Sequence, residues 1–287
     1  MSKKLKIYSA LESVVPRRTL WQLGRFLYQG ARRELLNAPD RNGEYELLLK
    51  LAPHWQKASG ELRFLDVGAN FADWSVELLR ALGDDASRAR ISAFEPAPAQ
   101  AGRAERAIAA AAGDSGLATV LRSAVGAHTG EVSFMITGDA TGNSSIAADQ
   151  TETGGTITVP CTTLDAFIPA DCLAIHMIKV DTEGNDFNVI EGAKALFEAK
   201  KIEVLQFEYN SCWIAFHRHL RDVFELMAGT GYVIGNLSYS GIELHREWHP
   251  ELERFFETNF VILREDLIAP SGAKYVKFND SNVLISA

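Results

Sequence analysis

Two carboxylates stand at the ends of consecutive apolar runs. Asp66 precedes Gly68 by two residues in FLDVGANFADWS, and Glu95 ends the run ISAFE. A carboxylate at a strand tip suits a positively charged ligand, and an acid at the next tip accepts hydrogen bonds from both hydroxyls of a ribose. A dinucleotide-binding turn needs glycines where this chain has Asn70 and Asp73. The expected ligand joins a ribose to a cationic amino group without a diphosphate, as S-adenosylmethionine does. Alternatively, Asp66 only faces a helix dipole and Glu95 is a solvated strand end.

A second pair of carboxylates, Asp181 and Glu208, ends or nearly ends the runs IHMIKVD and EVLQFE. Adjacent strands lie about 4.8 Å apart, so both acids share one rim if these strands are neighbours. Like charges raise the pKa of one of the two acids, which makes a general base for a hydroxyl proton. Two other interpretations stay open: Asp181 favours the start of the next helix, or Asp181, Glu208 and Asn210 bind Mg²⁺. Lys179 shares the face of Asp181 and is expected to form a structural ion pair.

Histidines follow the second acid pair. His217 and His219 lie in NSCWIAFHRHL, where either can act as a base or be a surface histidine. The segment HREWH, residues 245–249, has the i, i+4 spacing of two zinc ligands on a helix. It lacks the glutamate of a metalloprotease motif and Pro250 follows directly, so we expect a solvated polar segment and assign no metal ligand.

The elements that position these residues are predicted from short apolar runs that alternate with amphipathic segments. Strands are expected over residues 63–67, 91–94, 119–123, 131–136, 175–180, 203–207, 232–237 and 260–263. Helices are expected over residues 73–82, 97–112, 185–199 and 220–228. Apolar strands separated by helices predict a mostly parallel α/β sheet, which the late strands close as an antiparallel hairpin. We expect a helical segment over residues 1–60 and the α/β domain over 61–287; the long loop at 137–155 closes over substrate or is a disordered excursion.

Composition narrows the class of protein. The 287 residues are 47% apolar and contain no apolar stretch of membrane-spanning length and no secretory leader. The three cysteines form no disulfide framework or C-x-x-C motif, which fits a cytoplasmic protein. Residues 1–33 hold eight Lys or Arg against Glu12, a formal charge of +7 that leaves −15 for the remainder. The acidic remainder argues against a nucleic-acid partner. The basic segment is expected to pack on the domain or on a second subunit, or to touch anionic lipid or an acidic glycan.

Six segments, in order, resemble the FkbM family of S-adenosylmethionine-dependent methyltransferases. They are DVGANFADWS (66–75), FEPAP (94–98), AVGAHTGEVSF (124–134), TTLDAF (162–167), IKVDTEGNDFNVIEGA (178–193) and FEYN (207–210). The resemblance implies a Rossmann-like, seven-stranded methyltransferase sheet and O-methylation of a hydroxyl on a sugar, glycan or secondary metabolite. The alternatives are a Mg²⁺-assisted enzyme of the catechol type and a cofactor-binding regulatory protein that does not react.

The resemblance also implies roles for individual residues. The implied cofactor-binding residues are Asp66, Gly68, Ala69, Asn70, Ser75, Glu95, Ser123, Ala124 and Asp181. Of these, Asp66, Gly68, Asn70 and Ser75 surround the methionine end, Glu95 holds the ribose, and Ser123 and Ala124 border the adenine. The candidate catalytic residues are Asp181, Glu208 and His217. Ala72 stands where the family usually has glycine, and its methyl group is expected to crowd the methionine tail of the cofactor.

Overall fold

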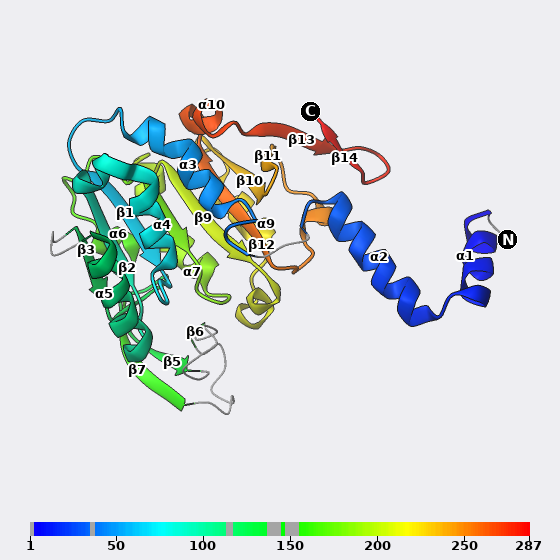
Figure 1. Cartoon of the computed structure of the whole chain (residues 1–287), viewed down its shortest axis with the longest axis horizontal. Coiled ribbons are helices and arrows are strands. Elements are labelled where there is room, and N and C mark those ends of the chain that lie inside the picture. The colour runs from blue at the N-terminus through cyan, green and yellow to red at the C-terminus, as the bar shows by residue number, and fades with distance from the viewer. Residues whose placement is uncertain (1–2, 35–37, 113–116, 137–144, 147–154) are drawn as a thin grey trace.

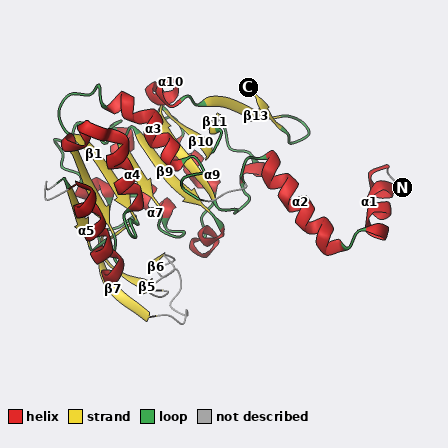
Figure 2. Ribbon diagram, viewed as in Figure 1, coloured by secondary structure: helices red, strands yellow, loops and turns green. Residues whose placement is uncertain are grey.

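The computed structural model describes residues 3–34, 38–112, 117–136, 145–146 and 155–287. In this part of the chain, one large sheet holds ten strands (Figures 1 and 2). Their order is β14 (Leu284–Ser286), β13 (Lys274–Phe278), β11 (Gly241–His245), β10 (Tyr232–Ser238), β12 (Thr258–Arg264), β9 (Val204–Tyr209), β8 (Met177–Val180), β1 (Leu62–Val67), β2 (Ala89–Phe94) and β3 (Ala118–Leu121). The seven strands from β10 to β3 form the predicted methyltransferase sheet. Parallel pairing runs from β3 to β9, and β12 is antiparallel to both β9 and β10, which confirms the predicted closing hairpin.

Both faces of the sheet are apolar, because alternate side chains of each strand pack against helices on opposite sides. Leu65 and Ile178 pack in the same cluster as Phe187 and Val189, which come from helix α7. The neighbouring Phe64 faces the other way, into the cluster that covers the second face. The helices on these faces are α3 (Glu44–Trp55), α4 (Asp73–Leu82), α6 (Leu164–Phe167), α7 (Asp186–Glu191), α8 (Lys194–Glu198) and α9 (Leu220–Met227). This two-sided burial explains the continuous apolar runs in the sequence.

The remaining elements are a second sheet, short helices, and helix α5, which packs on β2 and β3. A second sheet has the order β4 (Ala124–Val125), β7 (Gly155–Thr162), β5 (Gly130–Ile136) and β6 (Ser145–Ile146). The predicted strand at 131–136 therefore belongs to this sheet. Helix α5 (Pro98–Ala112) precedes β3, and α10 (Ile268–Ser271) precedes β13. Four 3-10 helices are η1 (Gly83–Arg88), η2 (Ser211–Phe216), η3 (Pro250–Leu252) and η4 (Glu265–Leu267). Residues 137–144 and 147–154, and with them most of the long loop predicted at 137–155, lie outside the described residues.

One predicted helix is interrupted. The segment 185–199 forms two helices, α7 and α8, that separate at Gly192. A Cβ atom at Gly192 would lie 2.2 Å from the carbonyl oxygen of Gly126, so the chain passes too close to the end of β4 for a side chain. The periodicity of the sequence cannot show this contact, because Gly126 is distant along the chain.

The three N-terminal helices differ in burial. Helices α1 (Lys3–Val14) and α2 (Arg17–Ala31) contain no buried residue and project from the body (Figure 1). Helix α3 instead buries Leu47, Leu48 and Trp55 against the sheet. The division of the chain at residue 60 stays a prediction. None of the helices in the described part of the chain has the length and apolar character needed to cross a bilayer.

Candidate active site

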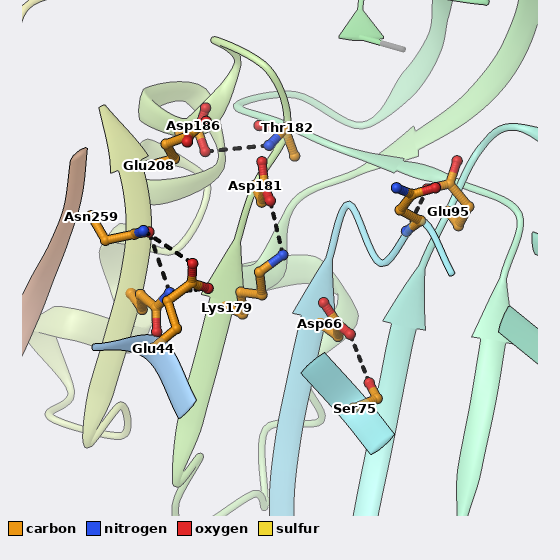
Figure 3. A network of polar contacts seen from close by, with 12 residues as sticks. Glu44, Asp66, Ser75, Glu95, Lys179, Asp181, Thr182, Asp186, Glu208 and Asn259 are labelled. Atoms are coloured by element: carbon orange, nitrogen blue, oxygen red, sulfur yellow. Dashed lines mark hydrogen bonds and ion pairs between the residues drawn. The ribbon is translucent and has the colours of Figure 1, made fainter. Parts of the chain in front are cut away.

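A pocket opens at the carboxyl ends of β1, β2 and β8, beside the start of β4 (Figure 3). Ligands of open α/β sheets bind at this edge. The lining residues are Val67, Gly68, Asn70, Phe94, Glu95, Pro96, Ser123, Ala124, Val125, Phe134, Ile146, Asp181, Thr182 and Asn185. Six of the nine residues expected to bind the cofactor are among them, from four separate stretches of the chain: Gly68, Asn70, Glu95, Ser123, Ala124 and Asp181.

Three residues in the turn after β1 have left-handed backbone conformations. Gly68 has φ +78°, and a Cβ atom there would lie 1.8 Å from the carbonyl oxygen of Asp181. Asn70 and Ala72 also adopt left-handed conformations, with φ +48° and +63°. Ala72 is fully buried against small side chains and does not line the pocket. The expectation that its methyl group crowds the cofactor stays a prediction, and the left-handed φ explains why glycine suits this position.

Asp66 and Ser75 lie beneath the pocket, with neither side chain exposed. The hydroxyl of Ser75 donates to Oδ2 of Asp66 at 2.7 Å (Figure 3), while Oδ1 of Asp66 has no hydrogen-bond partner among the described residues. Burial raises the pKa of Asp66, and the nearby charge of Lys179 opposes that rise. Ala69 is also buried and packs with Ala93. These three expected cofactor residues, Asp66, Ser75 and Ala69, stand outside the pocket lining.

Glu95 presents a fixed carboxylate to the pocket. Its Oε2 accepts the N–H of Asn70 at 2.9 Å, and its Oε1 accepts the N–H of Ala97 at 2.8 Å. Burial raises the pKa of Glu95, and the two backbone hydrogen bonds oppose the rise. A carboxylate oxygen has more than one lone pair, so Glu95 keeps acceptor capacity for a ligand hydroxyl. The residue links the turn after β1 to the tip of β2.

The second acid pair meets at one rim, because β8 and β9 are neighbours and Val180 pairs in register with Phe207. Asp181 lines the pocket, whereas Glu208 is buried. Burial raises the pKa of Glu208, and the charges of Asp181 and Asp186 raise it further. Oε2 of Glu208 accepts the side-chain N–H of Asn210 at 2.8 Å. The rim therefore combines one half-exposed carboxylate with one that retains its proton at neutral pH.

Lys179 lies beneath Asp181 and pairs with it, with 3.0 Å between Nζ and Oδ2 (Figure 3). Burial lowers the pKa of Lys179, but attraction by Asp181, Asp66 and Glu44 outweighs burial and raises the pKa above its ordinary value. The ammonium group is therefore a fixed positive charge between the two strand-tip acids. The ion pair expected between Lys179 and Asp181 is present in the structure.

Sequence reasoning missed a buried polar network beside Lys179. Glu44 at the start of α3 accepts the side-chain N–H groups of Gln206 at 2.7 Å and Asn259 at 3.1 Å. Asn42 also donates to Glu44, at 2.6 Å. The sequence indicates this network only through a polar residue within or at the start of an apolar run, Gln206 in EVLQFE and Asn259 in TNFVILR. Pairing of β9 with β12 brings both under α3.

The loop after β8 is held by hydrogen bonds to the carboxylate of Asp186. Its Oδ1 accepts the N–H of Thr182 at 3.3 Å, and its Oδ2 accepts the N–H of Gly184 at 3.1 Å. Burial raises the pKa of Asp186 to about 7, and repulsion by Asp181 adds to this. Asp186 therefore does more than complement a helix dipole, because it fixes the backbone that follows Asp181.

The histidines lie away from this pocket. His217 is exposed after η2, with φ +53°, and His219 is exposed at the start of α9; neither lines the pocket. The expectation of a solvated HREWH segment is wrong at His245, which ends β11 with 5% exposure and stacks on Phe278. Burial lowers the pKa of His245 to about 4.

The residues named for Mg²⁺ do not present a free oxygen set. The side-chain oxygen of Asn210 accepts the N–H of Cys212 at 2.8 Å, and its amide nitrogen points to Glu208. Within the described residues, no group of three or more His, Cys, Asp or Glu side chains is arranged to hold a metal ion.

The strand order, the glycine turn and the tip acids define the class of Rossmann-like methyltransferases. The methyltransferase FkbM domain matches residues 66–234, and the chain belongs to this family. No curated protein sequence matches the chain. Among solved structures, the chain is similar to methyltransferase FkbM from Methylobacillus flagellatus KT (14% identity, TM-score 0.45), covering 70% of this chain and 43% of that one. It is also similar to the O-methyltransferase TomG from Streptomyces achromogenes, solved with S-adenosylmethionine (16% identity, TM-score 0.43), covering 80% and 81% of the two chains.

Proposed function

We propose that this protein is a cytoplasmic O-methyltransferase that uses S-adenosylmethionine and acts on a hydroxyl of a sugar, glycan or secondary metabolite. The observation that carries the proposal is the pocket that Glu95 and Asp181 line together with Gly68. The three cysteines are free thiols, which suits a reducing compartment.

The pocket residues fit the cofactor by their chemistry. Glu95 offers charged acceptors for the ribose hydroxyls, and Ser123 and Ala124 supply a small-residue wall for a flat adenine. Gly68 and Asn70, from the turn after β1, also line the pocket, and the methionine end is expected beside them. Asp66, whose Oδ1 is unpaired among the described residues, adds negative charge beneath an ammonium group. When bound, the cofactor supplies an electrophilic methyl group on a sulfonium.

The base comes from the rim formed by Asp181 and Glu208. Asp181 lines the pocket and accepts the proton of the acceptor hydroxyl as its oxygen becomes nucleophilic. Lys179 holds this carboxylate by the 3.0 Å ion pair, which limits its rotation. Glu208 is buried beside Asp181 and keeps its proton, so the pair carries one negative charge instead of two. His217 is a secondary candidate, because it is exposed and stands outside the pocket lining.

Turnover and its pH dependence test the proposal. A panel of sugars, glycans and phenolic metabolites is incubated with methyl-labelled cofactor, and the best acceptor is used for variants. Asp181→Asn is expected to reduce kcat roughly 10²–10⁴-fold with a small change in cofactor affinity. Glu208→Gln is expected to leave the acidic limb of the pH profile in place, because a protonated Glu208 adds no charge beside Asp181.

Four outcomes contradict parts of the proposal. Loss of the acidic limb in Glu208→Gln assigns the base to Glu208. Near-normal rates in both variants exclude the rim, and His217→Ala is then measured. Cofactor binding without transfer to any acceptor supports a regulatory protein, while loss of turnover in chelator restores the Mg²⁺-assisted mechanism.

A further inference from the structure

The N-terminal arm, defined as α1 and α2 with the following Arg32 and Arg33, projects from the body (Figure 1), and near its end Tyr28 and Arg25 pack against Phe256. Ten of the sixteen exposed large apolar side chains of the described residues lie on it. They are Leu5, Ile7, Tyr8, Leu11, Val14, Trp21, Leu23, Phe26, Leu27 and Tyr28. Neither helix buries a residue. An apolar area this concentrated on one projecting element marks an interaction site.

The pattern of α2 separates apolar from basic side chains. Leu20, Leu23 and Leu27 recur at helical spacing on one face, and Trp21 and Phe26, 66% and 58% exposed, flank that face. Arg18 and Arg25, together with Gln22 and Gln29, fall on the opposite side. A short helix with Leu on one face, Arg on the other and aromatic side chains at the borders between them is typical of helices that lie in a membrane interface.

Charge favours an anionic surface as the partner. The segment 1–33 carries eight Lys or Arg and one acid, Glu12, for a formal charge of +7. Two such arms repel each other, which disfavours pairing of the arms of two copies. A membrane surface rich in anionic phospholipid attracts each basic residue near it by about 1 kcal/mol.

A groove beside α2 is lined by both aromatic and positively charged side chains. Trp21 and Phe26 line it together with Tyr239 from the turn between β10 and β11, and Arg25 and Arg41 lie at its edge. Aromatic walls suit an acyl chain or glycerol backbone, and two guanidinium groups suit a lipid phosphate. The groove also connects the arm to the body of the molecule.

We infer that the N-terminal arm binds the surface of an anionic phospholipid bilayer and lies in the interface without crossing it. The 15 residues of α2 extend about 22 Å, shorter than a hydrocarbon core of about 30 Å. Binding on this side fixes how the methyltransferase body meets the membrane. The inference is independent of the proposed reaction, because its test contains no turnover measurement.

Vesicle co-sedimentation of the full chain tests the inference. The probes are vesicles of phosphatidylcholine alone and of phosphatidylcholine mixed with phosphatidylglycerol, each at low and high salt. We expect tight binding to the anionic vesicles that weakens at high salt. The double variant Trp21→Ser with Phe26→Ser should bind roughly tenfold or more weakly, and Arg17→Gln about fivefold more weakly.

The matched control is Leu49→Ser with Leu173→Ser, which removes two exposed apolar side chains from the body, 63% and 93% exposed. This control should bind as the unchanged chain does, and thermal unfolding should be the same for all variants. Equal binding to neutral and anionic vesicles, or binding that survives the Trp21 and Phe26 replacements, overturns the inference. Self-association that these replacements abolish, without vesicle binding, assigns the arm to a second copy and also overturns it.

Discussion

At the scale of single residues, Glu95 holds the turn after β1 and faces the pocket at once. Its two carboxylate oxygens accept the backbone N–H groups of Asn70 and Ala97. An amide at this position would turn its NH₂ group toward one of these donors. Replacing one carboxylate oxygen of Glu95 by an amide nitrogen therefore affects both the pocket and the turn.

Glu95→Gln is predicted to weaken binding of S-adenosylmethionine by about 1.5–3 kcal/mol, the range for hydrogen bonds to charged groups. Isothermal titration calorimetry measures this, with Glu105→Gln on α5 as the control, because Glu105 pairs only with Arg122 at the surface. Unchanged affinity in a folded Glu95→Gln variant would remove Glu95 from the cofactor site.

Because the pKa of Asp186 is raised in the folded state, we predict that its contribution to the free energy of unfolding decreases as pH rises. Its folded pKa of about 7 lies above the ordinary value near 3.8. The folded state then binds more protons than the unfolded state between these values, so its contribution to the free energy of unfolding falls as pH rises through this window. Asp186→Asn removes that dependence.

Urea unfolding at several pH values measures this effect. Relative to the unchanged chain, Asp186→Asn should gain up to about 4 kcal/mol between pH 4 and pH 8, at about 1.4 kcal/mol per pKa unit. Glu198→Gln, on the exposed face of α8, should show no such trend. Parallel pH curves for Asp186→Asn and the unchanged chain would contradict the prediction.

At the scale of elements, the approach of the β1 turn to the end of β8 decides the shape of the pocket. Gly68 lies against the carbonyl group of Asp181, and the N–H of Asp181 donates to Val67. The pocket exists because these two strand ends touch without an intervening side chain. The same kind of contact, between Gly192 and Gly126, divides α7 from α8.

Gly68→Ala is predicted to lower the free energy of unfolding by at least about 3 kcal/mol, because it adds a left-handed alanine and a steric overlap. Gly102→Ala is the matched control: Gly102 lies inside α5, and an added Cβ would meet only Arg106 at 3.7 Å. This control should gain about 0.5–1 kcal/mol from helix propensity. Equal effects in urea unfolding would show that the close contact does not constrain the turn.

At the scale of the whole molecule, the arm is tied to the body through Glu34. This side chain is 2% exposed and pairs with Arg254 and, at 3.5 Å, with Arg32. Asn236 on β10 also donates to it, at 3.1 Å. Burial raises the pKa of Glu34 to about 7, while Arg32 opposes the rise. Glu34 thus joins the last turn after α2 to the sheet.

Glu34→Ala leaves the guanidinium of Arg254, 8% exposed, without this partner. Breaking a buried ion pair typically costs about 3–5 kcal/mol, so we predict a loss of this size and faster tryptic cleavage after Arg32. Glu243→Gln is the control: its pair with Arg33 is half exposed on the arginine side, and its loss should cost less than about 1 kcal/mol. Unchanged proteolysis of Glu34→Ala would show that Glu34 does not fix the arm.

The sequence by itself determined the order of strands and helices and the positions of the tip acids. Apolar runs and helical periodicity are local, so α4 is found at its predicted residues and seven of the eight expected strands are found in the large sheet. The placement of Glu95 and Asp181 at strand ends follows from the same local pattern. The roles proposed for both in binding and catalysis stay predictions.

The tertiary structure alone decided which residues face the pocket and which support it. Asp66 lies beneath the turn because its strand position points into the sheet–helix layer, where Lys179 balances it. Glu44 and Asn259 meet although 215 residues separate them, because β12 inserts beside β9 under α3. His245 is buried because β13 pairs with β11 and brings Phe278 against it. Contacts between distant segments depend on packing of the whole sheet, which local periodicity does not encode.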